Sequence, residues 1–155
     1  SILSMSFFSW QDTFVDLGSG KGRTLLIASE YFENVKGIEF SENLCRISRK
    51  NIDIYSQKKG ESLIDRISVI HGDVTNYNID HKENVFFMAN TFNDKVLKIF
   101  LENLENSINK APRTIWIIYV NAYHRDILDI MPIFSIIWKK NMDYKECIIY
   151  KNNYQ

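Results

Sequence analysis

Residues 16–23 read Asp-Leu-Gly-Ser-Gly-Lys-Gly-Arg and directly follow the apolar pair Phe14-Val15. Glycine occupies every second position from Gly18 to Gly22, and a helical pattern begins at Thr24. Glycine adopts positive φ without a steric penalty and lets a ligand approach the backbone closely. The start of a helix adds unpaired N–H groups. The stretch therefore predicts a strand–turn–helix junction that holds a ligand, and the carboxylate before the turn favours an amino-acid-bearing nucleoside over a bare phosphate.

The glycine spacing separates this turn from two related motifs. A dinucleotide-binding turn has the pattern G-x-G-x-x-G, and a phosphate-binding P-loop has G-x-x-x-x-G-K followed by Ser or Thr. Here the pattern is G-x-G-x-G, and Gly22 follows Lys21. A second predicted strand, 35–39, ends in an acid, Glu39. An acid on the tip of the neighbouring parallel strand reaches ribose hydroxyls, although Glu39 could equally be a solvated strand end.

Apolar periodicity predicts an α/β fold. Strands are expected at 14–17, 35–39, 67–71, 84–88, 114–120, 133–139 and 146–151, and helices at 22–32, 42–58, 94–109 and 122–130. Ser41 is expected to cap the second helix and Gly60 to end it. The alternation predicts a Rossmann-like, seven-stranded, mostly parallel sheet with helices on both faces. The last two strands are expected to form an antiparallel hairpin with its turn at 141–143.

Composition indicates a globular chain without a membrane segment. The chain has 155 residues, of which 45% are apolar and 25% charged, and its net charge is zero. This length suits a single domain over 1–155, and no apolar run is long enough to span a membrane. The charge balance argues against a nucleic-acid partner. Two isolated cysteines, Cys45 and Cys147, indicate a reducing compartment, which we expect to be the cytoplasm, and no zinc site.

Three motifs in order resemble the cofactor motifs of class I S-adenosylmethionine-dependent methyltransferases. They are residues 16–23, then Gly-Ile-Glu-Phe-Ser at 37–41, then Gly-Asp-Val at 72–74. The resemblance covers residues 12–121 and implies S-adenosyl-L-methionine as the cofactor, with Glu39 on the ribose, Asp73 on the adenine amino group, and Phe40 and Val74 sandwiching the ring. The residues that it implies at the cofactor are Asp16, Gly18, Ser19, Gly20, Gly22, Glu39, Phe40, Asp73, Val74 and Asn90.

The end of the fourth predicted strand carries the signal for the methyl acceptor. Amino-methylating members of this class place Asn or Asp, then proline, then an aromatic residue at this point. The chain has Asn90 and Phe92 with Thr91 in place of proline, which resembles histone-lysine methyltransferases of the disruptor-of-telomeric-silencing type. The resemblance implies that Asn90 accepts from the target amine and that Phe92 packs on it. It implies a protein lysine as acceptor and needs no catalytic metal. Asn90 could instead cap the next helix.

Other functions stay open at this point. Asn121, Tyr123 and His124 follow the fifth predicted strand and are candidates to line the acceptor pocket. A small molecule could replace the protein lysine as acceptor. Class I members usually have upstream helices that close over the cofactor. Here only residues 1–12 are available before the first predicted strand, which leads into the glycine turn. We therefore expect such lid helices to be missing from this stretch, and a non-catalytic nucleoside-binding module is the second hypothesis.

Overall fold

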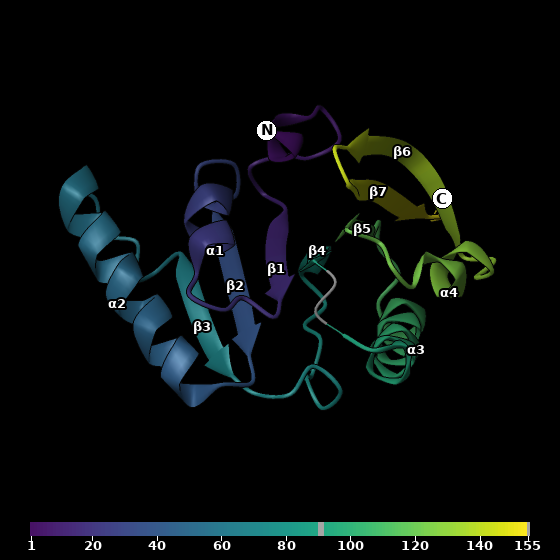
Figure 1. Cartoon of the computed structure of the whole chain (residues 1–155), viewed down its shortest axis with the longest axis horizontal. Helices are drawn as coiled ribbons and strands as arrows, with labels where there is room; N and C mark the ends of the chain where they lie inside the picture. Colours follow the sequence, from purple (N-terminus) through teal and green to yellow (C-terminus); the bar gives the residue numbers. More distant parts are fainter. Residues whose placement is uncertain (90–91, 155) are drawn as a thin grey trace.

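The computed structural model describes residues 1–89 and 92–154 (Figure 1). The strands are β1 (Thr13–Leu17), β2 (Asn34–Glu39), β3 (Ile67–His71), β4 (Glu83–Ala89), β5 (Trp116–Val120), β6 (Phe134–Met142) and β7 (Lys145–Asn152). The helices are α1 (Arg23–Ala28), α2 (Glu42–Lys59), α3 (Asp94–Lys110) and α4 (Arg125–Asp129), preceded by a short 3-10 turn, η1 (Ile2–Ser4).

The strands form one seven-stranded sheet with the order β3-β2-β1-β4-β5-β7-β6. The first five strands of this order pair in parallel, whereas β7 lies antiparallel between β5 and β6. This confirms the predicted mostly parallel sheet with a C-terminal hairpin. The strand order reverses between β1 and β4, and ligands of such sheets bind outside the carboxyl ends of the strands at this switch point.

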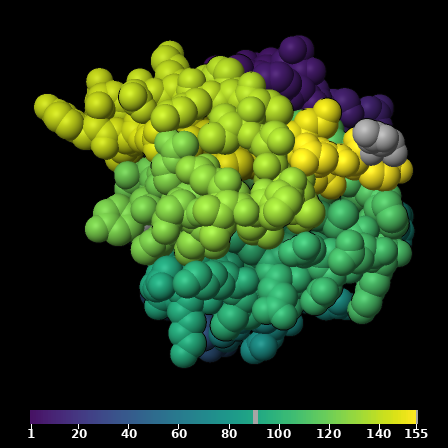
Figure 2. Space-filling view, turned by 90° about the vertical axis from the view of Figure 1, so that its right-hand side faces the viewer, coloured from purple at the N-terminus to yellow at the C-terminus, as the bar shows by residue number. Residues whose placement is uncertain are grey.

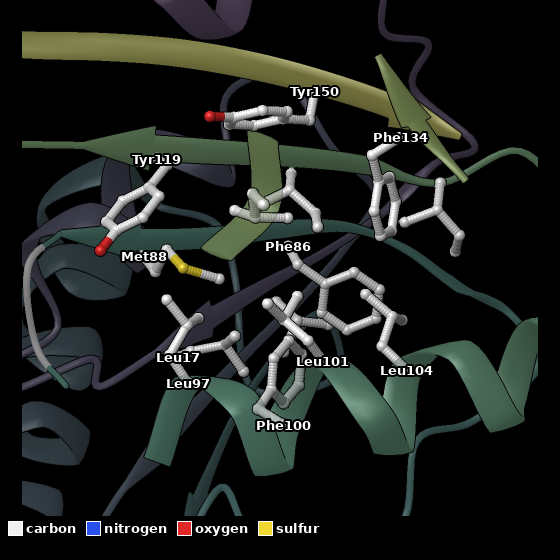
Figure 3. Close-up of a cluster of buried hydrophobic side chains, with 14 of the residues drawn as sticks. Leu17, Phe86, Met88, Leu97, Phe100, Leu101, Leu104, Tyr119, Phe134 and Tyr150 are labelled. Carbon is white, nitrogen blue, oxygen red and sulfur yellow. The ribbon is translucent and has the colours of Figure 1, made fainter. Parts of the chain in front are cut away.

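Helices cover both faces of the sheet, as predicted, because alternate residues of each strand point to opposite faces. On one face, Phe86 and Met88 of β4 pack with Leu97, Phe100 and other residues of α3 in a buried cluster. Figure 3 shows these sheet side chains facing those of α3. On the other face, Phe14 and Val85 pack with residues of α1 and α2. The central strands β1 and β5 are therefore buried on both sides.

Helix α2 begins and ends where its capping residues predict. The Ser41 side chain accepts a hydrogen bond from the Leu44 N–H at 3.3 Å, and Gly60 ends the helix at φ 68°. Helix α1 is shorter than the predicted 22–32. The Ser29 hydroxyl donates to the Leu26 carbonyl at 2.7 Å, and residues 29–31 form turns. A serine that bonds back to the preceding turn competes with continued helix.

Two predicted boundaries in the C-terminal part were wrong. The hairpin turn lies at Asp143-Tyr144 rather than at 141–143, with Asp143 at φ 53°. Helix α4 starts three residues after its predicted start, because Asn121 takes a left-handed conformation with φ 53° and its carbonyl accepts from the Tyr123 N–H at 2.7 Å. Figure 2 shows the hairpin (yellow-green) lying across one end of the molecule above α3 (green).

Candidate functional site

The glycine turn follows β1 and is held in an open, left-handed path. Gly18, Gly20 and Gly22 have φ values of 96°, 55° and 86°. The N–H groups of Gly18 and Ser19 both donate to the Ile38 carbonyl, at 2.8 and 3.1 Å. This anchors the turn to the neighbouring strand β2. A Cβ atom placed on Gly20 would meet no atom within 4 Å, so the turn borders open space at this position.

The back of the turn packs tightly against β2 and α2. A Cβ on Gly37 of β2 would lie 2.5 Å from Ser19 Oγ and 2.7 Å from Ser19 Cβ. A Cβ on Gly22 would collide with Ser48 Oγ of α2. The Asn51 side-chain N–H donates to the Lys21 carbonyl at 3.0 Å. The turn is thus fixed on the side away from the open space. Gly22 and Gly37 are required there because a Cβ atom at either position would collide with its neighbours.

Asp16 lies directly before the turn and is buried, with 4% of its surface exposed. Burial, and to a smaller extent the nearby charge of Glu39, raise the pKa of its carboxyl from 3.8 to about 7. Within the described part of the chain, no group donates a hydrogen bond to this carboxyl. A buried acid without a partner from its own chain is a strong indication of a ligand-binding group.

Glu39 lies at the end of β2, half-buried, and its Oε2 accepts from the Phe40 N–H at 3.0 Å. The Glu39 carbonyl accepts from the Gly72 N–H at 2.9 Å, which brings the end of β3 beside it. The Phe40 ring is 76% exposed. An aromatic ring this exposed at the carboxyl edge of a sheet is suited to stack on a ligand.

Asp73 and Val74 follow β3 at the same edge. Asp73 Oδ1 accepts from both the N–H and the hydroxyl of Thr75, at 2.9 and 2.8 Å. These two bonds lower the pKa of Asp73, so the group is an ionised acceptor at neutral pH. Val74 is buried and packs with the core cluster beside α3. Asp73 therefore shapes its own loop and stays charged at this edge of the sheet.

The predicted acceptor residues are placed only in part. Asn90 lies outside the described residues. Phe92 is half-buried against the core cluster of α3. After β5, Tyr123 is 77% exposed, and Tyr119, which is buried, accepts from the His124 N–H at 3.2 Å through its hydroxyl. The left-handed Asn121 is a non-glycine residue in a conformation that costs free energy, and such residues cluster at functional sites.

The structure thus brings together the predicted cofactor residues from the ends of β1, β2 and β3. Sequence reasoning placed Gly37 in the second cofactor motif but did not predict that Gly37 and Ser48 fix the turn from behind; a glycine inside a buried strand is a signal of close backbone approach. Among residues 1–89 and 92–154, no three His, Cys, Asp or Glu side chains gather as a metal site would need. No helix in these ranges is long and apolar enough to cross a membrane.

Comparison with protein families gives one match. Residues 1–115 match the family model described as histone methylation protein DOT1. This match includes the glycine turn, Glu39, Asp73 and the end of β4. A comparison with curated protein sequences gives no significant match.

Comparison with solved structures gives many similar chains. An RNA methyltransferase of Salinibacter ruber, solved with S-adenosyl-L-homocysteine, has a TM-score of 0.66 and 16% identity over 97% of this chain and 87% of its own. An rRNA methylase of Streptococcus thermophilus has a TM-score of 0.65 and 10% identity, over 95% of this chain and 90% of its own. A ribosomal protein L11 methylase of Lactobacillus delbrueckii has a TM-score of 0.65 and 14% identity, over 90% of this chain and 69% of its own. These likenesses show that the chain has a methyltransferase fold.

Proposed function

The chain belongs to the family of histone methylation protein DOT1, and from this premise we propose that it is a methyltransferase that uses S-adenosyl-L-methionine to methylate the side-chain amine of a protein lysine. The observation that carries the cofactor part of the proposal is the buried Asp16 carboxyl, which has no donor in the described chain and directly precedes the glycine turn that borders open space at Gly20. A carboxyl in this position suits the cationic amino group of an amino-acid-bearing nucleoside.

The residues present fit such a cofactor. Gly20 leaves room for a ligand against bare backbone, and Asp16 offers a buried acceptor. Glu39 would accept from ribose hydroxyls, Asp73 from the adenine amino group, and the exposed Phe40 ring would cover one face of the base. When bound, S-adenosyl-L-methionine supplies an electrophilic methyl carbon on its sulfonium. The chain's own residues hold the cofactor, orient the acceptor and exclude water.

The acceptor side of the proposal rests on the sequence after β4. Asn90 is the proposed acceptor of a hydrogen bond from the target amine, and the Phe92 ring is proposed to pack beside it. The exposed Tyr123 and the strained Asn121 lie after the neighbouring strand β5, so they are proposed to border the acceptor. An amine must lose its proton before it can attack, and the apolar Phe92 ring beside it would favour the neutral form.

A labelled-methyl assay tests the proposed acceptor. The chain is incubated with S-adenosyl-L-methionine labelled on its methyl group and, separately, with core histones, ribosomal protein, total RNA and a small-molecule fraction. We expect label on a lysine of a protein, located by mass spectrometry of the product. Label on RNA or on small molecules alone would contradict the lysine proposal. Cofactor binding without any methylated product would favour a non-catalytic nucleoside-binding module.

Replacing Glu39 by Ala tests the ribose contact. If Glu39 accepts from both ribose hydroxyls, its loss leaves those donors unpaired and weakens S-adenosylhomocysteine binding by about 1–3 kcal/mol. Isothermal titration calorimetry measures this change. The matched control is Glu33→Ala, because Glu33 is an exposed acid before β2 with no side-chain partner among the residues described. An unchanged dissociation constant for a folded Glu39→Ala protein would show that Glu39 only ends its strand.

Replacing Asn90 by Ala tests the acceptor contact. A group that acts on the acceptor need not contact the ribose or adenine, so we expect turnover to fall by more than about tenfold while cofactor affinity changes little. Product formation is followed by mass spectrometry and cofactor binding by calorimetry. Asn109→Ala, an exposed amide near the end of α3, serves as control. Equal losses of turnover and affinity would place Asn90 at the cofactor instead.

A further inference from the structure

Helices α1 and α2 lie side by side on one face of the sheet (Figure 1), and a groove of about 270 Å³ opens between them. The groove has an apolar floor and a basic rim. Its lining consists of Leu26, Ile54 and Tyr55, called here the floor, of the exposed cations Lys21, Arg23 and Lys58, called the rim, and of Asn51. None of the residues that the predicted cofactor site uses lines this groove. It lies behind the glycine turn, because Lys21 and Arg23 flank Gly22.

The three rim cations have no partner within the described part of the chain. Lys21, Arg23 and Lys58 are exposed, and none of them makes a side-chain ion pair or hydrogen bond there. The neighbouring Lys59 behaves differently, since its ammonium pairs with Glu30 at 2.6 Å. A groove that keeps three cations unpaired around an apolar floor is complementary to an acidic partner that also presents an apolar side chain.

We propose that this groove between α1 and α2 docks an acidic protein segment that inserts one apolar side chain over Leu26 and Ile54. The exposed Ile54 supplies an apolar contact, with 42% of its surface accessible. The rim cations then pair with acids on either side of the inserted residue. Such a segment binds because burial of the apolar anchor adds to the attraction of the charges.

The floor disfavours a nucleic-acid strand as the occupant. A phosphodiester backbone would place charged, hydrated phosphates and polar sugars over Leu26 and Ile54 rather than an aliphatic side chain. One face of the Tyr55 ring already carries the Lys59 ammonium, 5.6 Å from the ring centroid, and the Tyr55 hydroxyl donates to Glu30 Oε1 at 2.6 Å, so the ring offers a base at most one face. A peptide of mixed acidic and apolar side chains matches both the rim and the floor.

Fluorescence anisotropy with short labelled peptides tests the proposal. The probe peptide carries Asp and Glu around one central Leu. One control peptide, the Ser twin, has Ser in place of Leu, and a second, the Lys twin, has Lys in place of the acids. A single-stranded DNA oligonucleotide is the fourth probe. We expect saturable binding of the acidic Leu peptide that weakens with salt, about tenfold weaker binding of the Ser twin, and none of the Lys twin.

Two groove variants and one matched control locate the binding. Lys58→Glu reverses a rim charge, and Ile54→Ser removes the floor contact without a charge change. Each is expected to weaken binding of the acidic Leu peptide by about fivefold or more. Lys50→Glu makes the same charge change on the same helix outside the groove, and is expected to change the affinity by less than about twofold. Circular dichroism checks that all three variants fold.

Four results would overturn the proposal. They are no saturable binding of the acidic Leu peptide, equal binding of the Leu and Ser peptides, equal losses for Lys50→Glu and Lys58→Glu, or tighter binding of the oligonucleotide with the same dependence on Lys58. The third result would indicate a diffuse basic face of α2, and the last a nucleic-acid surface.

Discussion

Replacing Asp16 by Asn is expected to weaken cofactor binding by at least about hundredfold while it makes the ligand-free protein more stable at pH 8. The carboxyl is buried without a hydrogen-bond donor from the described chain, and burial together with the charge of Glu39 raises its pKa to about 7. At pH 8 the folded protein must therefore hold a poorly solvated negative charge. Asparagine has nearly the same shape and carries no charge, so the cost of burying that charge disappears in the variant.

The sign of the pH effect follows from the raised pKa. Below about pH 4 the carboxyl is protonated in both the folded and the unfolded chain, so it contributes no difference. Between pH 4 and 7 only the unfolded chain ionises, and the stability of the folded state falls as the pH rises. A pKa moved from 3.8 to about 7 corresponds to roughly 4 kcal/mol lost across this interval. The Asn variant lacks this loss.

Urea unfolding and calorimetry check both halves of this prediction. The gain in unfolding free energy from Asp16→Asn should be small at pH 5 and large at pH 8. Binding of S-adenosylhomocysteine at pH 8 should weaken by at least about hundredfold, because a charged hydrogen bond to the ligand's amino group is lost. Asp65→Asn, at an exposed acid without a side-chain partner in the described residues, is the control. A variant that binds like the wild type would remove Asp16 from the cofactor site.

The same titration predicts how the wild-type affinity depends on pH. The ionised carboxyl is the form that attracts a cationic amino group, so cofactor affinity should rise as the pH passes through about 7. Binding near pH 6 should release a proton from Asp16, since the ligand's positive charge lowers the pKa of the carboxyl. Calorimetry in buffers of different ionisation enthalpy measures this release. An affinity that is constant from pH 6 to 8 would contradict it.

Most elements could be predicted because local signals agree with the tertiary structure. Strand β3 occupies the predicted residues, and α2 differs by one residue at its end. The Ser41 cap and Gly60 define that helix through contacts within a few residues, so a single sequence contains the needed information. The buried strands also read as apolar runs, which suits a sheet covered on both faces.

The hairpin turn could not be placed with the same accuracy. Residues 141–144 are all exposed, and β6 is an edge strand with many exposed side chains. No burial pattern therefore marks where the strand ends. The register is decided by pairing with β7, in which Met142 lies opposite Lys145 and only Asp143 and Tyr144 turn the chain. Such pairing is a non-local property.

The candidate site also has a part that the sequence predicts and a part that depends on tertiary packing. Asp16, the glycine turn and Glu39 were predicted together because they lie at neighbouring strand ends, and the register confirms that Asp16 pairs with Gly37, two residues before Glu39. The partners behind the turn were not predicted, because contact of Ser19 with Gly37 and of Gly22 with Ser48 depends on how β2 and α2 pack. Sequence spacing carries no signal for Ser48.

The second large effect is expected at Gly37, which lies in β2 and would not contact the cofactor itself. A Cβ at this position would lie 2.5 Å from Ser19 Oγ and 2.7 Å from both Ser19 Cβ and Leu25 Cδ1. Gly37→Ala should therefore push Ser19 and the glycine turn out of place. We expect it to destabilise the fold by about 1–3 kcal/mol, as overpacking does, and to weaken S-adenosylhomocysteine binding by more than about tenfold.

A second substitution distinguishes displacement of the turn from general damage to β2. Ser19→Gly removes both Ser19 atoms from the contact, and the remaining Leu25 methyl belongs to a flexible side chain. The double variant Gly37→Ala/Ser19→Gly should therefore recover much of the affinity lost in Gly37→Ala, and the Ser19→Gly single variant completes the cycle. Calorimetry and urea unfolding measure all four proteins. If the losses of the two single variants simply add, then Gly37 does not act through Ser19. Recovery in the double variant would show that the volume behind the turn controls how the turn holds its ligand.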